Sequence, residues 1–375
     1  MSGLYLHIPF CKQACHYCNF HFSTSLKYKR ELLEAMQTEI RLQKDYLEDK
    51  NLQTVYFGGG TPSLLTQEDI AALFRTIETH FTIAADAEIT LEANPDDLTL
   101  EKLQQLKDTP VNRLSIGIQS FADEDLRFMN RAHNAGEAKA CIKNALRLGF
   151  DNLTIDLIYG TPTTSDEQWM TNMDTVIDYG IPHISSYCLT VEPKTALDHF
   201  VKAGKAPPVD EEQSARQFEM LMQKMETHGY EHYEISNFAK PGWYARHNSN
   251  YWLGESYLGI GPSAHSFNGI SRQWNVAHNV KYRKAINEDR LQDVLEIERL
   301  STTQRYNEYV MTGLRTKWGC QLSKIQSFGE EYRIHFLKTI APFVEDGRVL
   351  NQGDQFVLTK AGKLLADRIA MEVFW

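Results

Sequence analysis

Three of the six cysteines lie close together near the start of the chain, as Cys11, Cys15 and Cys18. Three thiolates at the spacing Cys-x3-Cys-x2-Cys can surround one inorganic centre on a loop. A structural zinc site needs four ligands, usually in two separated pairs, which this spacing does not supply. A [4Fe–4S] cluster normally takes four cysteines, so three leave one iron open to a substrate or cofactor. The spacing favours such a cluster over the alternative of three buried free thiols, and Phe20 stands where a fourth thiol could have extended the set.

Other residues that could do chemistry follow strand-like runs further along the chain. A glycine turn, Gly58-Gly59-Gly60-Thr61-Pro62, follows one run, Glu92 and Gln119 end two others, and Asp156 lies within a fourth. Any one of them could be only a tight turn or a helix cap. In parallel α/β folds, however, the C-terminal ends of the strands meet on one face, where ligands bind. We therefore expect these residues to share one site with the cysteines.

The elements that must position this site alternate regularly. Six strand-like runs begin near residues 4, 54, 88, 113, 153 and 183, and stretches with helical period separate them. Thr66 and Ser165 precede two of these stretches and have the residue types of N-caps. Strand alternating with helix predicts a parallel sheet of βαβ units. Periodicity alone allows either an open doubly wound sheet or an incomplete barrel.

Beyond residue 190 this alternation ends. Residues 230–267 are aromatic and rich in glycine, which predicts strands and loops, and the end of the chain predicts helices, a hairpin around a Gly-Asp turn and a final helix. That order is typical of a winged-helix module. Residues 291–375 contain 11 Lys and Arg against 11 Asp and Glu, so we expect a packing or lid domain rather than a nucleic-acid binder. The predicted division is a core over 1–235, a connecting β-rich segment over 236–290 and a small α+β domain over 291–375.

The composition limits the compartment and the partners. The chain has 375 residues and a formal net charge of −10, which disfavours binding to nucleic acid. Six cysteines without an even framework of spacings point to a reducing compartment. No stretch has the pattern of a membrane span or a secretory signal. We expect a cytoplasmic protein with no integral membrane segment.

The cysteine motif after a first strand and Gly-Gly-Thr-Pro after a second resemble the radical S-adenosylmethionine (SAM) superfamily. The resemblance implies a partial (β/α)6 barrel, a [4Fe–4S] cluster on the three cysteines, SAM bound at its open iron, and a reductant for the cluster. In that family reductive cleavage of SAM gives a 5′-deoxyadenosyl radical. Carried over position by position, it also implies a set of residues around SAM, namely Tyr5, Tyr17, Gly59, Gly60, Thr61, Glu92, Gln119, Arg131 and Asp156.

Nearly the whole chain is similar to the branch that holds oxygen-independent coproporphyrinogen III oxidase and the haem chaperone HemW. The oxidase carries a fourth cysteine where this chain has Phe20, and a sizeable segment before the motif, whereas only ten residues precede Cys11 here. The chaperone resembles this chain in both respects and in a downstream His-Asn-x-x-Tyr-Trp motif, found here at residues 247–252. The resemblance implies a protein that binds haem and delivers it to an acceptor protein. Oxidative decarboxylation of coproporphyrinogen III is the first alternative, and radical chemistry on another tetrapyrrole, such as haem ring opening, is the second.

The same motif suggests where haem would bind. A neutral imidazole is a common axial ligand of haem iron, and aromatic rings offer an apolar face to a porphyrin. His247 is the expected axial ligand, with Tyr251 and Trp252 in apolar contact. A histidine among aromatic residues can equally be a hydrogen-bonded structural residue. His265 is the second candidate, followed by His228 and His232.

Overall fold

The fold is built on one large sheet, seen in a computed structural model that describes residues 2–375. Its first six strands are parallel and lie side by side in chain order, as in a barrel rather than in a doubly wound sheet. Strands β12 and β7 form the two edges, so the barrel stays open. The predicted α/β class with a partial (β/α)6 barrel is confirmed. The six strands are β1 (Ser2–Ile8), β2 (Asn51–Gly59), β3 (Thr82–Ala93), β4 (Arg113–Gln119), β5 (Leu153–Tyr159) and β6 (His183–Cys188).

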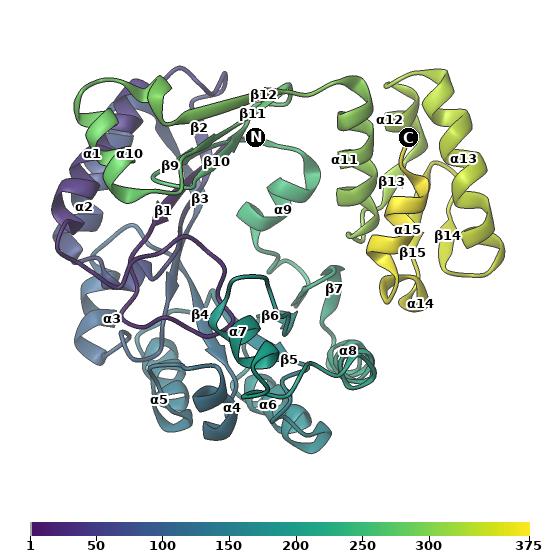
Figure 1. Ribbon diagram of the computed structural model, residues 1–375, viewed down its shortest axis with the longest axis horizontal. Helices are drawn as coiled ribbons and strands as arrows, with labels where there is room; N and C mark the ends of the chain where they lie inside the picture. The colour runs from purple at the N-terminus through teal and green to yellow at the C-terminus, as the bar shows by residue number, and fades with distance from the viewer. Residues whose placement is uncertain (1) are drawn as a thin grey trace.

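Helices separate these strands and cover the outside of the barrel (Figure 1). Both predicted N-caps are present: the hydroxyl of Thr66 accepts the N–H of Asp69, and the hydroxyl of Ser165 accepts the N–H of Gln168, each at 3.2 Å. Each cap satisfies an amide that the helix itself leaves unpaired. The helices of this half are α1 (Lys29–Leu42), η1 (Pro62–Leu64), α2 (Gln67–His80), α3 (Leu100–Lys107), α4 (Asp123–Phe128), α5 (Ala135–Arg147), α6 (Asp166–Asp178), α7 (Ala196–Lys202) and α8 (Glu211–Thr227).

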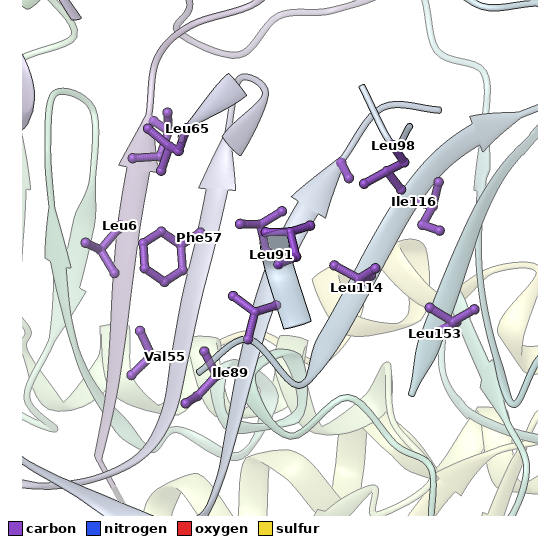
Figure 2. Close-up of a cluster of buried hydrophobic side chains, with 14 of the residues drawn as sticks. Leu6, Val55, Phe57, Leu65, Ile89, Leu91, Leu98, Leu114, Ile116 and Leu153 are labelled. Carbon is purple, nitrogen blue, oxygen red and sulfur yellow. The ribbon is translucent and has the colours of Figure 1, made fainter. Parts of the chain in front are cut away.

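The barrel strands are apolar on one face and polar on the other. Neighbouring strands bring five buried side chains into one row of the register, and Figure 2 shows them side by side: Leu6, Phe57, Leu91, Leu114 and Leu153. These residues belong to the main hydrophobic cluster, together with the buried residues of the outer helices. Because side chains alternate along a strand, the residues between them point into the barrel. These inward residues are largely polar, which makes the interior suitable for a binding site.

The chain beyond β6 extends the sheet at both ends. Strands β7 (Glu231–Glu234) and β8 (Asn237–Ala239) pair beyond β6, while β9 (Ser256–Ile260) pairs in parallel with β1. The next strands continue from β9 in antiparallel order, so the segment predicted as a connection contributes to the main sheet. The division at residues 235 and 290 stays a prediction. These strands and the helices beside them are β10 (His265–Phe267), β11 (Ser271–Asn275), α10 (Asn279–Asn287), η2 (Leu291–Asp293) and β12 (Leu295–Arg299).

The prediction of strands and loops throughout residues 230–267 was wrong for one part, because residues 246–253 form helix α9 (Arg246–Leu253). Ala245 at its N-cap has no side chain that could accept a hydrogen bond. The carboxylate of Glu88, inside the barrel, takes that role and accepts the N–H groups of Arg246 and His247, each at 3.0 Å. A residue far away in the sequence therefore starts this helix, and local sequence could not reveal it.

The C-terminal residues have their own hydrophobic core, which includes Tyr306, Phe336, Phe356 and Ile369. A hairpin with its turn at Gly353 (φ 85°) forms at the predicted Gly-Asp position. These elements stand beside the barrel, across α9 from α1 and α2 (Figure 1). None of the helices within residues 2–375 is long and apolar enough to cross a membrane. The elements are α11 (Thr302–Leu314), β13 (Cys320–Gln321), α12 (Leu322–Gln326), α13 (Glu330–Glu345), β14 (Val349–Asn351), β15 (Gln355–Leu358), α14 (Lys360–Lys363) and α15 (Ala366–Val373).

Replacing the Glu88 carboxylate tests how α9 is held. Glu88→Ala removes the acceptor of two helix N–H groups and leaves Arg113, whose Nε lies 4.0 Å from that carboxylate, as a buried charge. We expect the free energy of unfolding, measured by urea denaturation, to fall by about 2–4 kcal/mol. The exposed control Glu296→Ala should change it by less than about 0.5 kcal/mol. Equal effects in the two variants would show that apolar contacts alone hold α9.

Candidate functional site

The three motif cysteines lie on the loop between β1 and α1. Backbone hydrogen bonds close the base of this loop, from the Cys11 N–H to the Ser23 carbonyl at 3.0 Å and from the Ser23 N–H to the Pro9 carbonyl at 2.9 Å. Cys11, Cys15 and Cys18 are all partly exposed, and all three line one cavity of about 850 Å³. We call this space the first cavity. The loop thus brings the three thiols to the same side, as the spacing predicted.

Residues that follow α4 hold this loop in place. The Gln13 amide donates to the backbone carbonyl and to the side-chain oxygen of Asn130, both at 2.9 Å, and the Asn130 amide donates to the Ala14 carbonyl at 2.7 Å. The His16 N–H donates to the Met129 carbonyl at 3.1 Å. Asn130 has a φ of 55°, a left-handed conformation that asparagine adopts more readily than most residues. Sequence reasoning identified only Arg131 in this segment.

Arg131 connects the loop to two barrel strands. Its Nη1 lies 3.2 Å from the Cys15 sulfur, and its Nη2 donates to the Asn94 side-chain oxygen at 2.6 Å and to the Gly117 carbonyl at 2.7 Å. Its Nε is buried and has no hydrogen-bond partner among the described residues. A buried donor of this kind is rarely left unpaired in a native protein, so a water molecule or a ligand acceptor would satisfy it.

The three cysteine sulfurs are not gathered around a single point. Within residues 2–375 no three His, Cys, Asp or Glu side chains are close enough to ligate one metal ion. In a cubane cluster each thiolate binds a different iron, so its sulfurs stand further apart. Burial raises the pKa of Cys11 to about 11 and also raises the pKa of Cys18. The free thiols of Cys11 and Cys18 would therefore stay protonated at neutral pH, and metal binding would displace those protons.

The glycine turn after β2 packs directly against the start of the cysteine loop. The Gly60 N–H donates to the Ile8 carbonyl at 2.9 Å, and a Cβ on Gly60 would stand 2.7–2.8 Å from backbone atoms of Ile8 and Phe10. Gly59 has a φ of 103°, which only glycine adopts readily. Both glycines are therefore required by close approach and conformation, and both line the first cavity.

Two carboxylates lie deeper in the first cavity. Glu92 accepts the Tyr56 hydroxyl at 2.8 Å and the Gly59 N–H at 3.2 Å, and Asp156 accepts the Ser115 hydroxyl at 3.3 Å. Burial, and then the nearby charge of Glu92, raise the pKa of Asp156 to about 7. Gln119, which also lines this cavity, has a φ of 69°, and strained non-glycine residues of this kind often lie at binding sites.

The structure brings together eight of the nine residues expected around SAM. They line the first cavity with the cysteines and are Tyr17, Gly59, Gly60, Thr61, Glu92, Gln119, Arg131 and Asp156. Tyr5 is the exception and lines a different cavity. Its hydroxyl bonds to His7 Nδ1 at 3.1 Å, and its ring stacks on Tyr56 at 6.1 Å between centroids. A role of these nine residues in SAM binding stays a prediction.

A second cavity, of about 800 Å³, lies on the other side of the cysteine loop. Its walls come from β1, the end of the cysteine loop, the end of α9, β9–β11, α11 and α12 with the loop after it. Asn19 and Phe20 line both cavities, and the side chain of Phe20 is 67% exposed. The residue that replaces a fourth cysteine thus stands between the two spaces. The second cavity has many aromatic side chains, including Tyr251, Trp252, Tyr257, Phe267, Tyr309 and Phe328.

The structure separates the residues of the predicted haem motif. Tyr251 and Trp252 line the second cavity, but His247 is buried on α9. Its Nδ1 bonds to the Thr54 hydroxyl at 2.7 Å and its Nε2 to the Tyr251 hydroxyl at 2.8 Å. Burial lowers the pKa of His247 to about 3. His247 as the axial ligand stays a prediction that this arrangement does not favour, since both ring nitrogens already have partners.

The other candidate histidines differ in position. His265 is exposed and lines the second cavity. His228 bonds to the Lys224 carbonyl at 2.8 Å and His232 packs on Phe238 at 4.1 Å between ring centroids, and neither lines a cavity described above. Sequence reasoning missed the cationic residues of the second cavity. They lie on elements far apart in the chain and carry no motif: Arg272, Arg305 and Lys324.

Two protein-family models match this chain, one over the barrel and one over the C-terminal region. A family model described as the radical SAM superfamily matches residues 5–190, and a model of the HemN C-terminal domain matches residues 300–365. The first match contains the cysteine loop and all the residues expected around SAM. The second covers most of the C-terminal helices and the hairpin.

Relatives about one third identical in sequence match almost the whole chain. The chain is 35% identical over 372 residues to the heme chaperone HemW of Mycobacterium tuberculosis H37Rv, covering 98% of this chain and 93% of the relative. It is 34% identical to the heme chaperone HemW of Bacillus subtilis, covering 98% of each. Among solved structures, it is similar to the radical SAM enzyme coproporphyrinogen III oxidase (HemN) of Escherichia coli, with a TM-score of 0.85, 25% identity and coverage of 100% of this chain and 90% of that one.

The raised pKa of Asp156 predicts a pH-dependent cost to stability. Burial makes the charged form of the Asp156 carboxyl costly in the folded state. The free energy of unfolding is therefore higher while Asp156 is protonated, and it falls as the pH rises through the folded-state pKa of about 7. Asp156→Asn stays neutral. The free energy of unfolding of this variant minus that of the wild type should therefore increase by roughly 2 kcal/mol between pH 5 and pH 8, measured in the cluster-free protein.

Urea denaturation at the two pH values measures this gain, with the exposed Asp151→Asn as the control. The control should show no such growth. A gain for Asp156→Asn that does not depend on pH would mean that Asp156 is charged in the fold across this range.

Proposed function

Because the chain belongs to the radical SAM superfamily and, within it, to the family of the haem chaperone HemW, we propose that it binds haem and passes it to an acceptor protein. The observation that carries this proposal is identity of 34–35% to curated heme chaperones over 98% of the chain. The relatives match both the barrel and the C-terminal region, so the likeness is not confined to the cluster-binding half.

The first cavity is the proposed site of the resident cofactors. Cys11, Cys15 and Cys18 would hold a [4Fe–4S] cluster, which supplies an open iron where SAM binds. The Gly59-Gly60 turn lines the same cavity, so its backbone groups can contact a ligand there. Arg131, with its unpaired buried Nε, suits a carboxylate, while the carboxylates of Glu92 and Asp156 suit an ammonium group or ribose hydroxyls.

The second cavity supports haem as the cargo. Its aromatic lining offers an apolar surface to a flat ring, and Tyr251 and Trp252 of the predicted haem motif contribute to it. Phe20 supports haem binding over decarboxylation, because it places an apolar ring at the position where the oxidase pattern has a fourth cysteine. Decarboxylation of coproporphyrinogen III remains the alternative, favoured by the fold likeness to HemN.

The setting follows from the sequence and the family. We propose the cytoplasm as the location, a haem-acceptor protein and a reductant for the cluster as partners, and no role in nucleic-acid binding. The net charge of −10 and the balanced charge of the C-terminal region support the last point. The C-terminal region also supplies three residues that line the first cavity, namely Arg315, Lys363 and Asp367. This contribution supports a role of the C-terminal region as a lid domain.

A cysteine variant tests the cluster. After anaerobic reconstitution, Cys15→Ala should lose the [4Fe–4S] signal seen by EPR of the reduced protein, and its iron and sulfide content should fall accordingly, because two thiolates do not hold a cubane. Cys141→Ala, which removes a buried thiol on α5, is the matched control and should keep the full cluster. Retention of the full signal in Cys15→Ala would rule out this ligand set.

Parallel titrations test the function. The reconstituted protein should bind haem, seen as a Soret band, and with SAM and a reductant it should leave coproporphyrinogen III unconverted. E. coli HemN serves as the positive control for conversion. Stoichiometric formation of protoporphyrinogen by this chain would overturn the proposal in favour of the oxidase, and absence of haem binding would contradict it directly.

A further inference from the structure

We propose that haem occupies the second cavity with His265 as its axial ligand and with its propionates on Arg305 and Lys324. This inference rests on the proposed haem-chaperone function and assigns that function to a definite place. It differs from the expectation that His247 ligates the iron, and it puts the cargo in a different space from the cluster and SAM.

The size and lining of the cavity suit a porphyrin. Ligand pockets are typically about 300–1,000 Å³ and mostly apolar with a few placed polar groups, and this one is about 800 Å³. Tyr251 and Tyr257 meet edge to face at 4.5 Å between ring centroids on the barrel side. Tyr309 and Phe328 face the same space from the C-terminal region. A flat apolar ring can therefore contact aromatic side chains from two separate parts of the fold.

His265 is the imidazole best placed to ligate iron from this lining. It begins β10, where its register partner on β11 is Trp274, and the two rings stack at 5.8 Å and 24°. This stacking fixes the orientation of the ring while its nitrogens stay accessible in the cavity. Because side chains alternate along a strand, Phe267 lies on the same face as His265. The strand thus presents an imidazole and an apolar ring together.

The other histidines of the lining are less well placed. His7 bonds through Nδ1 to the Tyr5 hydroxyl at 3.1 Å and donates through Nε2 to the His21 carbonyl at 2.9 Å, so both of its nitrogens are engaged. His21 donates through Nε2 to the Asn279 side-chain oxygen at 2.7 Å and keeps a lone pair on Nδ1, but its ring is half-buried and stacks on His7 at 6.2 Å between centroids. An axial ligand must offer an accessible nitrogen lone pair, and breaking the bonds of His7 would cost free energy. His265 is exposed and needs no such exchange.

The charges of the lining match a dianionic cargo. Arg272 and Glu308 form an ion pair at 3.0 Å and offset each other. This leaves Arg305 and Lys324 as the two cations available to the two propionates of haem. The Nε of Arg305, like that of Arg272, is buried without a hydrogen-bond partner among the described residues, and Lys324 is exposed beside Phe328, 5.5 Å from the centre of its ring. Arginine and lysine form charge-assisted bonds with carboxylates, and such bonds would satisfy the unpaired donor.

The second cavity lies next to the cysteine loop, and so next to the proposed cluster. Among residues 2–375, only Asn19 and Phe20 line both cavities. Haem in the second cavity would therefore be separated from the cluster by this short piece of chain, and both cavities could be filled at once. Phe20 would offer its ring to the porphyrin where a fourth cysteine would have offered another thiol to the cluster side.

The axial ligand is tested by haem titration of the reconstituted full-length protein, followed by absorption and EPR spectra. His265→Ala should shift the Soret band, change the ferric EPR signal and weaken haem binding by about tenfold, the effect of losing one good polar contact. His247→Gln, which can keep hydrogen bonds to Thr54 and Tyr251, should leave the wild-type haem spectrum, and so should the control His228→Ala. An unchanged spectrum in His265→Ala, or a shift in His247→Gln alone, overturns the assignment. A wild-type protein that binds no haem would instead refute the haem-chaperone function itself.

The propionate contacts are tested with two forms of the cargo, haem and its dimethyl ester. Arg305→Ala and Lys324→Ala should each bind haem about tenfold more weakly than the wild type, because each loses a charge-assisted contact. Their affinity for the ester, which lacks the negative charges, should match that of the wild type. The exposed Lys338→Ala on α13 is the control for the loss of a positive charge. Equal weakening for both forms, or no change for haem, would show that the propionates lie elsewhere.

Discussion

The contact between the Arg131 guanidinium and the cysteine loop is the interaction on which the rest of the site depends. One side chain reaches the Cys15 sulfur, the Asn94 amide oxygen and the Gly117 carbonyl, and so joins the loop after β1 to β4 and to the residue that follows β3. Asn130, its neighbour, anchors the loop through Gln13 and Ala14. If this segment moved, the thiols would lose their common orientation, and the partition between the two cavities would move with them.

The linings of the two cavities suit two different ligands. The first is polar at depth, with carboxylates, an arginine and a bare glycine turn, and it suits a charged small molecule next to an iron–sulfur cluster. The second is aromatic with a few cations, and it suits a flat, largely apolar dianion. The C-terminal region contributes side chains to both, so any movement of α11 and its neighbours would affect the two spaces together. This shared wall gives a physical route by which occupation of one cavity could influence release from the other.

Much of the fold could be predicted from the sequence because its signals are local. Apolar runs mark the six strands, and Thr66 and Ser165 mark helix starts by a contact only three residues away. The first cavity was predictable for a topological reason, since parallel strands bring their C-terminal ends together. Helix α9 was not, because its N-terminus is capped by Glu88, more than 150 residues earlier. The second cavity was missed for the same reason: Tyr257, Arg272 and Phe328 meet only once the C-terminal region has packed beside the barrel.

The most direct test of a haem chaperone with two neighbouring cavities is iron-edge anomalous diffraction from crystals of the reconstituted, haem-loaded protein. Two separate iron sites are expected. One is a cluster at Cys11, Cys15 and Cys18 in the first cavity, and the other is a single iron in the second cavity, within bonding distance of the His265 imidazole, with Phe20 between them. A haem iron in the first cavity, or on the outer surface of the protein, would contradict this division of the molecule.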